Sequence, residues 1–463
     1  MTDSQSTPSQ LEYDDELRII TPEFVQQVQD AIEDQDKKAC KAMVKPLEAE
    51  DLADLFEYLS PEDHQALVGW ISKDQIGDLL TEVDEDIRDQ IVENMATKDL
   101  ATALKDLDSD DAVHVIEDLS EEDQQAVLGR LPEQDRALIE DSLSYPEDTA
   151  GRLMQHEVVT VPSHWDVGTT IDFMRNEKNG LPEEFYEIFV VNPRFEVIGL
   201  LSVSKLLRHS RKELVEDLIR SEFKSVPAMA DQEDVAHLFR TYGLISAPVI
   251  NESGRLLGRI TVDDVMDVMD EEAEEDLMRL GGVGTDDLYL AVLKTSRLRF
   301  WWLGVNLLTA FFASLVIAQF SDALETIVAL AILMPIVASM AGNAGTQTLT
   351  VTVRALAMRE LSEINFSRLV GKEILVGTLN GVLFAGLTAG AAYLWFSDLS
   401  VAIIIAASTV ASLMVANCAG AAIPYTLDRL KIDPAIASGV FLTTVTDVMA
   451  FATFLGLSTL FLL

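Results

Sequence analysis

Five long apolar stretches near the C-terminus constrain the fold of this chain more than any other feature. They cover roughly residues 300–320, 324–350, 369–396, 400–424 and 434–461. Each is long enough to cross a lipid bilayer as an α-helix, which takes ~20 residues. In hydrocarbon the backbone N–H and C=O groups must be hydrogen-bonded internally, and a helix achieves this within one segment. The sequence therefore predicts an all-α membrane domain with five spans over residues 286–463.

Basic residues beside these stretches predict the orientation of the spans. They precede the first stretch, separate the second from the third and separate the fourth from the fifth: Lys294, Arg297, Arg299; Arg354, Arg359, Arg368, Lys372; Arg429, Lys431. The links "SDALE" and "SDLS" contain no Lys or Arg. Because cytoplasmic loops are enriched in these residues, we expect a multi-pass protein of the inner (plasma) membrane with its N-terminus inside and its C-terminus outside. No signal peptide is visible in "MTDSQSTPSQ", so we expect the first 285 residues to be cytoplasmic.

Charge divides the chain at the same point. The formal net charge is −43, of which residues 286–463 contribute only −2 and residues 1–285 therefore −41. Such an excess of acid argues against nucleic-acid binding, which needs Lys and Arg to neutralise phosphates. It suits solubility, basic partners or metal cations. The only cysteines, Cys40 and Cys418, lie in different parts, so neither a disulfide framework nor a zinc cluster is expected.

Two features interrupt the apolar spans. The second span contains Pro335 and then the small and polar run "AGNAGTQTLT" at 341–350. One interpretation is close helix packing through small residues. The other, which the Asn and Gln in this run favour, is a helix break that lines a pore. The last span contains a single charged residue, Asp447, near its middle. It is either a protonated carboxyl buried between helices or, since no Lys or Arg is embedded nearby, a ligand on a cation path.

The acidic part begins with a repeat of twelve residues. Apolar residues recur at that spacing from Leu47 through Leu59, Ile71 and Val83 to Leu143, each followed by capping or acidic residues. Ser60 before Pro61 is a good N-cap with proline at the first helical position. Short helices repeated at a fixed period predict an α-helical superhelix.

A second repeat follows, with an offset of 59 residues. "VVNPRFEVIGLLSVSK" from Val190 matches "VINESGRLLGRITVDD" from Val249, and each copy has an upstream helical pattern. This order of strand, turn, glycine and strand resembles a pair of α/β CBS domains. The resemblance implies a regulatory sensor, often of adenosine nucleotides such as ATP. Thr261 and Asp264 are then candidate ribose contacts, whereas the first copy has Ser202 and Lys205 at these positions.

Residues 261–282, "TVDDVMDVMDEEAEEDLMRLGG", predict an amphipathic helix that ends at a Gly pair. The spacing predicts one apolar stripe: Val262, Met266, Met269, Ala273, Leu277 and Leu280. Acidic residues crowd the other side, where like charges at i,i+4 destabilise a helix. The acidic face is either simply solvated or neutralised by divalent cations, and oxygen ligands select Mg²⁺ or Ca²⁺.

This order of parts resembles the MgtE family of magnesium transporters, most specifically in "PIVASMAGNAGTQTLTVTVRALA" and "TTVTDVMAF". Ala341 replaces the first of two glycines that usually precede the motif asparagine. The expected division is a disordered tail (1–20), an acidic helical superhelix (21–145), two CBS domains (146–210 and 211–262), an acidic connecting helix (263–285) and the membrane domain (286–463). The fold class is a multidomain membrane protein.

The resemblance implies a homodimer in membrane lipid, with the pore at the interface of the membrane domains. Asp447 matches the pore aspartate, Asn343 the motif asparagine, and Asp433 an acid at the cytoplasmic mouth. The implied regulatory Mg²⁺ ligands are Glu233, Asp264, Asp267, Glu272, Glu275 and Asp276, and Asp110 and Asp111 are candidates in the superhelix. A further family ligand is replaced here by Gly243.

The expected function is a channel-like, Mg²⁺-selective uptake system gated by cytosolic Mg²⁺, and not an enzyme. No GxxxxGK[ST] motif for ATP-driven pumping is present. Alternatives are a CBS-regulated transporter of another divalent cation such as Co²⁺ or Mn²⁺, a CBS-gated anion transporter, and a membrane-anchored sensor of Mg²⁺ or nucleotide. Asp447 counts against the anion transporter, and the polar run at 341–347 counts against the sensor.

Overall fold

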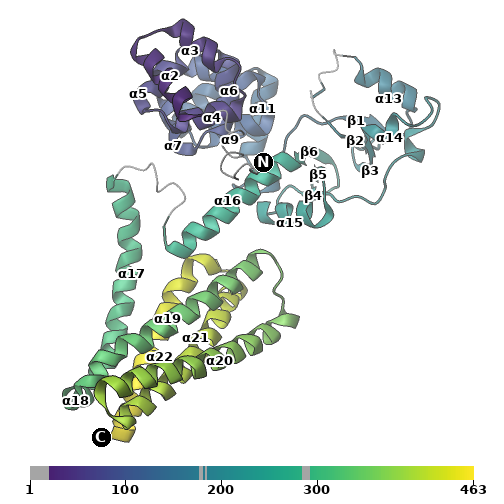
Figure 1. The fold of residues 1–463 in the computed structure, drawn as a ribbon. Coiled ribbons are helices and arrows are strands. Elements are labelled where there is room, and N and C mark those ends of the chain that lie inside the picture. Colours follow the sequence, from purple (N-terminus) through teal and green to yellow (C-terminus); the bar gives the residue numbers. More distant parts are fainter. Residues whose placement is uncertain (1–19, 177–180, 183–184, 284–291, 463) are drawn as a thin grey trace, which may run out of the picture. The chain divides into compact units, whose positions relative to one another are not determined.

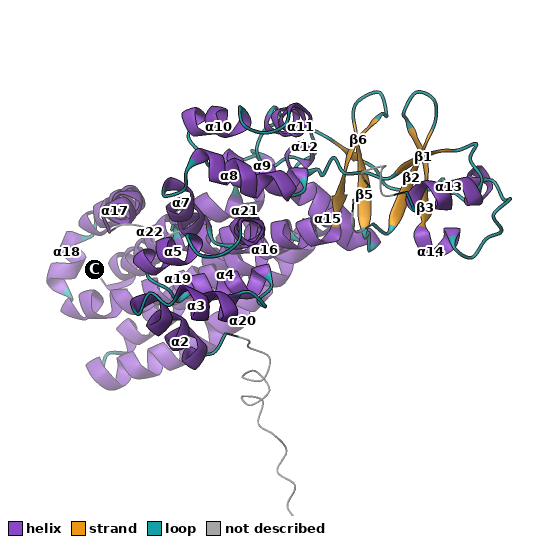
Figure 2. Ribbon diagram, turned by 90° about the horizontal axis from the view of Figure 1, so that it is seen from above, coloured by secondary structure: helices purple, strands orange, loops and turns teal. Residues whose placement is uncertain are grey.

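A computed structural model describes residues 20–176, 181–182, 185–283 and 292–462. The chain divides into two compact units, Met1–Asp270 and Glu271–Leu463. Strands occur only in the stretch from β1 to β6, and the other described elements are helices (Figures 1 and 2). Apart from Ile20, the tail expected at 1–20 lies outside the described residues.

Short helices build the first part of the N-terminal unit. In chain order they are α2 (Pro22–Glu33), α3 (Lys37–Val44), α4 (Ala49–Glu57), α5 (Pro61–Val68), α6 (Lys73–Glu82), α7 (Glu85–Glu93), α8 (Thr97–Ala103), η1 (Leu104–Asp106), α9 (Ser109–Glu117), α10 (Glu121–Leu128) and α11 (Glu133–Leu143). The repeated apolar residues lie at the corners: Leu59, Ile71 and Val83 each stand between two helices and are buried in one core. Ser60 and Asp63 form a reciprocal capping box at the start of α5, as the Ser-Pro signal predicts. The twelve-residue period is thus one short helix plus one buried corner.

Two similar three-stranded sheets follow. The first comprises β1 (Thr160–Pro162), β2 (Glu187–Val191) and β3 (Val197–Ser202); the second comprises β4 (Val226–Pro227), β5 (Ser246–Ile250) and β6 (Leu256–Thr261). The shorter helical elements of this region are α12 (Ala150–Leu153), α13 (Val167–Met174), α14 (Val203–Leu206), η3 (Val215–Asp217) and α15 (Gln232–Tyr242). In both sheets the first two strands pair in parallel and the last two pair antiparallel. The register of the antiparallel pair shifts at equivalent positions, between Val190 and Val191 in the first sheet and between Val249 and Ile250 in the second. The 59-residue offset therefore marks a structural repeat.

Helix α16 (Val262–Gly281) bears out the predicted apolar stripe only in part. The residues that it buries are Val265 and Val268, which pack into the core of the second sheet domain. Of the predicted stripe, Val262, Met266 and Leu277 are exposed. Met269 is partly buried and packs against the same core, and Leu280 packs against a core of the second unit. The 3.6-residue period allowed more than one face, and the packing surface beside the sheet selects the face that contains the two valines.

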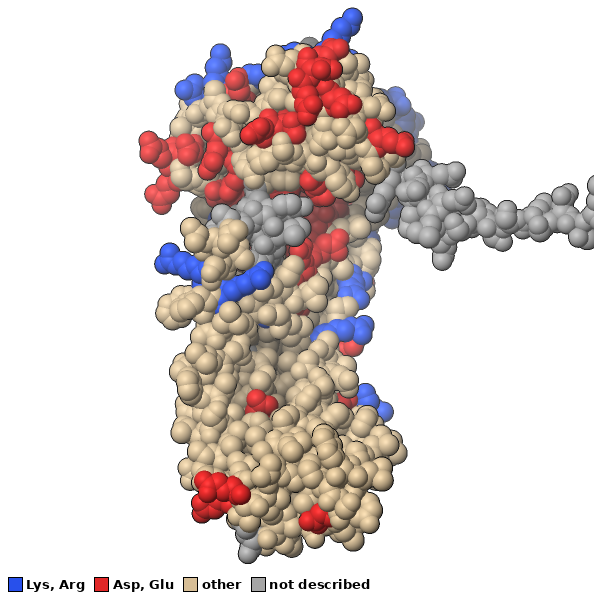
Figure 3. Space-filling view, turned by 60° about the vertical axis from the view of Figure 1, so that its left-hand side comes forward, with Lys and Arg blue, Asp and Glu red and all other residues tan. Residues whose placement is uncertain are grey.

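The second unit contains the five long apolar helices. They are α17 (Val292–Ala318), α19 (Val328–Ala357), α20 (Glu363–Phe396), α21 (Leu399–Arg429) and α22 (Pro434–Leu462), and the short α18 (Ser321–Thr326) lies in the first link. All five are long and apolar enough to span a membrane, as the sequence predicts. Helix α21 packs against α19, α20 and α22 and is the most buried of the five. Figure 3 shows a nearly uncharged surface over these helices, in contrast to the acidic surface of the N-terminal unit.

Candidate functional site

The polar run at 341–350 does not break its helix, contrary to the favoured expectation. Helix α19 is continuous from Val328 to Ala357, with Pro335 inside it. Hydroxyl groups of Thr346 and Thr350 donate to the carbonyl oxygens four residues earlier, at 3.0 Å each. The threonines thereby satisfy their own hydrogen bonds without unwinding the backbone. Ala341 and Gly345 of this run are buried in close packing, which was the alternative interpretation, whereas the space beside Gly342 is open.

One face of α19 buries glycine and the opposite face exposes polar groups. A Cβ on Gly345 would lie 3.1 Å from Leu442 and 3.2 Å from Thr446, both on α22. We call the exposed residues at i, i+3, i+4 and i+7 the polar stripe: Asn343, Thr346, Gln347 and Thr350. A polar stripe on a membrane helix is costly against lipid, so it points to a partner or a water-filled path.

Asp447 lies on α22, directly after Thr446, which packs against Gly345. The residue is partly exposed. Across the described ranges, no side chain or backbone group donates a hydrogen bond to its carboxylate, and no Lys or Arg pairs with it. A carboxylate in this position is open to a cation that approaches along the exposed face.

Asp433 precedes α22 and already has a cationic partner. One carboxylate oxygen accepts a hydrogen bond from the backbone N–H of Ala435 at 2.7 Å. The other accepts from Arg279 of α16 at 2.7 Å, and Arg279 also pairs with Glu275. Burial, followed by the charges of Asp433 and Glu272, raises the pKa of Asp276. Two predicted ligands of the second unit, Glu275 and Asp433, therefore share one arginine that the sequence analysis missed, and Asp276 lies within electrostatic reach of Asp433 and Glu272.

A second acidic group forms within the N-terminal unit. Burial, followed by the charge of Asp264, raises the pKa of Asp111 to about 7 and that of Asp110 well above its usual range. Burial and then Glu50 and Asp267 raise the pKa of Glu82 on α6. One oxygen of Asp110 is buried without a hydrogen-bond partner. We call Glu82, Asp110, Asp111, Asp264 and Asp267 the acidic cluster.

The acidic cluster fits a divalent cation by its chemistry. It offers hard oxygen ligands and repulsion that a cation would relieve. The structure describes no group of three His, Cys, Asp or Glu side chains already close enough to hold a metal ion. Asp110 and Asp111 were predicted only as candidate ligands in the superhelix, without a partner on α16, and Glu82 was not predicted at all. Glu82 is the last residue of α6, and the repeat pattern gives no sign of what faces it.

The remaining predicted residues occupy less defined places. Glu233 is exposed in the first turn of α15, and its backbone N–H bonds to Asp231 at 2.9 Å. Asp264 also caps α16, because its carboxylate accepts hydrogen bonds from the backbone N–H and the hydroxyl of Thr261. The candidate ribose contacts thus bond to each other. Gly243 ends α15 with a φ of +60°, a conformation that favours glycine over the acidic residue of the family.

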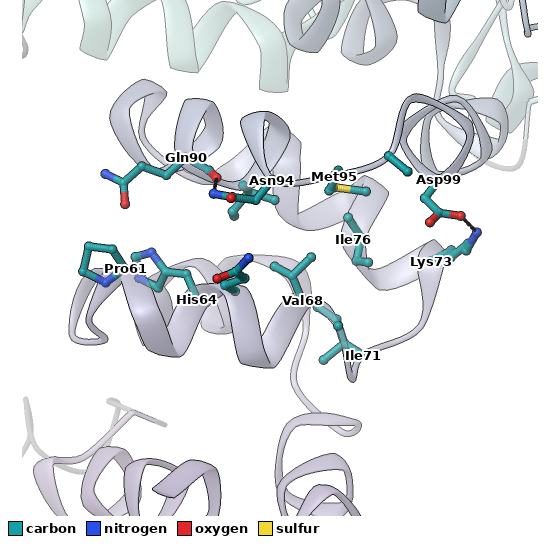
Figure 4. A pocket seen from close by; sticks show the side chains of 14 residues that line it. Pro61, His64, Val68, Ile71, Lys73, Ile76, Gln90, Asn94, Met95 and Asp99 are labelled. Atoms are coloured by element: carbon teal, nitrogen blue, oxygen red, sulfur yellow. Dashed lines mark hydrogen bonds and ion pairs between the residues drawn. The ribbon is translucent and has the colours of Figure 1, made fainter. Parts of the chain in front are cut away.

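Two cavities lie elsewhere in the N-terminal unit. A cavity of about 490 Å³ in the first sheet domain is lined by Lys205 and Arg220 among others, the latter paired with Glu187. It contains Ser202 and Lys205, the residues that stand in the first copy at the positions of Thr261 and Asp264, and Glu187 and Glu222 also line it. A cavity of about 260 Å³ lies between α5–α6 and α7–α8, where His64 and Val68 face Gln90 and Met95 (Figure 4).

Comparisons with known proteins find matches in the helical, sheet-containing and membrane parts of the chain. Family models match residues 47–148 (MgtE intracellular N domain), 150–212 and 215–271 (CBS domain) and 334–457 (MgtE, divalent cation transporter). The magnesium transporter MgtE of Bacillus subtilis is 33% identical over 325 residues, which cover 69% of this chain and 71% of that protein. MgtE of Thermus thermophilus is 34% identical over 331 residues, covering 70% and 73%.

A solved structure, the cytosolic domain of the Mg²⁺ channel MgtE in complex with ATP, is 28% identical. It matches with a TM-score of 0.50 and covers 53% of this chain and 99% of that chain. The chain is thus a multi-pass membrane protein that combines a helical N domain, a CBS pair and five candidate spans. It belongs to the MgtE family of magnesium transporters.

Proposed function

We propose that this magnesium transporter is a channel-like homodimer whose ion path includes Asp447 and the polar stripe. The supporting observation is the exposure of Asn343, Thr346, Gln347 and Thr350 on a helix that packs beside Asp447. A second copy would cover this face and remove polar groups from lipid. It would also bring two Asp447 carboxylates together, and such a pair can hold Mg²⁺ through its water shell, which the ion gives up reluctantly.

The membrane potential would drive uptake. It contributes ~2.3 kcal/mol per charge per 100 mV, so about twice that for a divalent ion. In this proposal the N-terminus lies in the cytoplasm and the C-terminus lies outside the inner membrane, as the flanking basic residues predict. The expected domain division, from the superhelix at 21–145 to the membrane domain at 286–463, is part of the same proposal.

The acidic residues of the cytosolic parts would form the gate. At high cytosolic Mg²⁺, ions bound at the acidic cluster and around Asp276 and Asp433 would favour the closed state. At low Mg²⁺ the carboxylates repel, and the population shifts to the open state. Glu233 would supply a further ligand. The cavity at Lys205 would accept ATP, since a related cytosolic domain has been crystallised with ATP.

The pore assignment is tested with Asp447→Asn in the full-length protein reconstituted in liposomes that contain a Mg²⁺-sensitive dye. We expect Mg²⁺ flux to fall to that of protein-free liposomes. Asp428→Asn, which removes an exposed carboxylate at the end of α21, should leave flux within twofold, or about 0.4 kcal/mol. Full flux in the Asp447 variant would refute the pore assignment.

The gate is tested with the triple variant Glu272→Gln, Glu275→Gln, Asp276→Asn. We expect it to lose the protection from protease that Mg²⁺ confers on the cytosolic part. Unchanged protection would show that this segment of α16 does not belong to the sensor.

A further inference from the structure

Glu373 is a buried acidic residue of the membrane helices, and neither the ion path nor the gate proposed above uses it. It lies on α20 with only 7% of its surface exposed. A carboxylate buried among membrane helices is unfavourable unless it is bonded, and such residues are usually functional. The question is therefore what its bonds hold in place.

The bonds of Glu373 join three helices at one level. Its carboxylate accepts a hydrogen bond from the hydroxyl of Thr348 on α19, at 3.0 Å. Its backbone carbonyl accepts from the side-chain amide of Asn417 on α21, at 3.2 Å. Thr348 and Asn417 are each 3% exposed, so both bonds are shielded from water. Lys372 lies 3.5 Å from the other carboxylate oxygen, but its own side chain is mostly exposed.

Close packing surrounds this junction. A Cβ on Gly420 of α21 would lie 2.6 Å from the carbonyl oxygen of Gly345 and 3.0 Å from Thr348. A Cβ on Gly377 of α20 would lie 3.0 Å from the carbonyl oxygen of Leu413 on α21. The three backbones therefore approach closely at the level of Glu373. Small rotations of α19 would produce clashes or voids, because packed interiors do not deform continuously.

Thr348 belongs to the buried face of α19, and the polar stripe belongs to the exposed face of the same turns. A helix is stiff over one or two turns, so a bond that holds Thr348 also sets the direction in which Asn343 and Gln347 point. A hydroxyl bonded to a carboxylate is a charge-assisted hydrogen bond, which is stronger and more directional than a neutral one.

We infer that Glu373 is a positioning residue for the ion path. Its carboxylate holds Thr348 and thereby fixes the rotation of α19 that presents the polar stripe beside Asp447. Glu373 does not itself bind the transported ion. This inference rests on the proposed function, because it assumes that the polar stripe lines the path.

Four variants of the full-length protein in liposomes test the inference. Thr348→Val removes the donor at nearly constant volume, and Thr348→Ser is its matched control. Glu373→Ala removes the acceptor, and Glu373→Gln keeps an acceptor oxygen without the charge. The readouts are Mg²⁺ flux per reconstituted dimer, the half-saturating Mg²⁺ concentration, and the ratio of Mg²⁺ to Ca²⁺ flux. That ratio does not depend on the yield of folded protein, so a variant that folds poorly is still informative.

We expect Thr348→Val and Glu373→Ala to raise the half-saturating Mg²⁺ concentration or to lower flux at least tenfold, and to change the flux ratio at least fivefold. Thr348→Ser and Glu373→Gln should stay within threefold of the unchanged protein. The double variant Thr348→Val, Glu373→Ala should be no worse than the more severe single variant, because both remove one bond. Loss of flux in Glu373→Gln together with normal flux in Thr348→Val would show a direct ion ligand and overturn the inference.

Asp447→Asn in the same assay separates the two proposals. If it abolishes flux while Thr348→Val and Glu373→Ala behave normally, only the positioning role fails. If Asp447→Asn itself conducts normally, the proposed ion path fails, whatever the Glu373 variants do.

Discussion

Asp111 provides a quantitative test of the repulsion in the acidic cluster. Burial, Asp264 and Asp108 raise the pKa of its carboxyl from 3.8 to about 7. A rise of about three pH units corresponds to about 4 kcal/mol between the two protonation states. If the superhelix separates from α16, the carboxyl regains water and its usual pKa. The docked arrangement therefore carries this penalty when Asp111 is ionised.

The sign of the pH effect follows from proton binding. Between pH ~4 and pH ~7 the docked state binds a proton that the separated state has lost, so docking weakens as pH rises through this range. The penalty is absent well below pH ~4 and complete well above pH ~7. Lowering the pH from about 8 to about 5.5 should recover about 2 kcal/mol of it. Bound Mg²⁺ should oppose the penalty at high pH, because it neutralises the same charge.

The assay is hydrogen exchange of α9 in the full-length protein without Mg²⁺, corrected for the intrinsic pH dependence of exchange. The free energy of opening of α9 should be about 2 kcal/mol higher at the lower pH than at the higher pH. In Asp111→Asn most of this difference should disappear, and protection at the higher pH should increase. Glu33→Gln, which removes one exposed charge from the same array, is the control. An unchanged pH dependence in Asp111→Asn, or an equal effect in the control, would refute the reasoning.

Three further predictions concern other parts of the molecule. Arg279→Gln removes the cation that already pairs with Asp433. The Mg²⁺ concentration needed to protect α16 from protease should therefore fall by ~3–10-fold, for an ion pair worth about 1 kcal/mol. A higher Mg²⁺ requirement would contradict this prediction. Gly420→Ala forces a Cβ against a backbone carbonyl and should lower the stability of the purified protein by ~1–3 kcal/mol, seen as earlier thermal unfolding. Gly386→Ala, with open space around it, should unfold like the unchanged protein. Lys205→Ala should weaken ATP binding at least tenfold, about 1.4 kcal/mol, in calorimetry, and unaltered affinity would place the nucleotide elsewhere.

Much of the fold could be predicted from local sequence patterns, because these patterns reflect which residues each segment buries. Five apolar stretches are enough to predict five spans, since a bilayer forces the backbone into helices. The corner residues Leu59, Ile71 and Val83 repeat because each short helix needs the same buried end. The apolar stripe predicted on α16 shows the limit of such patterns, because of its six residues only Met269 and Leu280 pack against a core. Its period fitted several faces, and only the neighbouring sheet domain decides that Val265 and Val268 are inside.

The sequence by itself determined the membrane spans, the acidic excess of the first 285 residues, the CBS repeat and the resemblance that singled out Asp447. Only the tertiary structure decided that α19 is unbroken, that Asp110 and Asp111 lie near Asp264, and that Arg279 forms an ion pair with Asp433. Spans and repeats depend on neighbours a few residues apart. Arg279 and Asp433 are 154 residues apart in the chain. The hydrogen bond from Thr348 to Glu373 joins residues that are 25 apart and lie on different helices. Such contacts depend on how helices rotate and cross when they pack, and that information is spread over the whole core rather than written beside either residue.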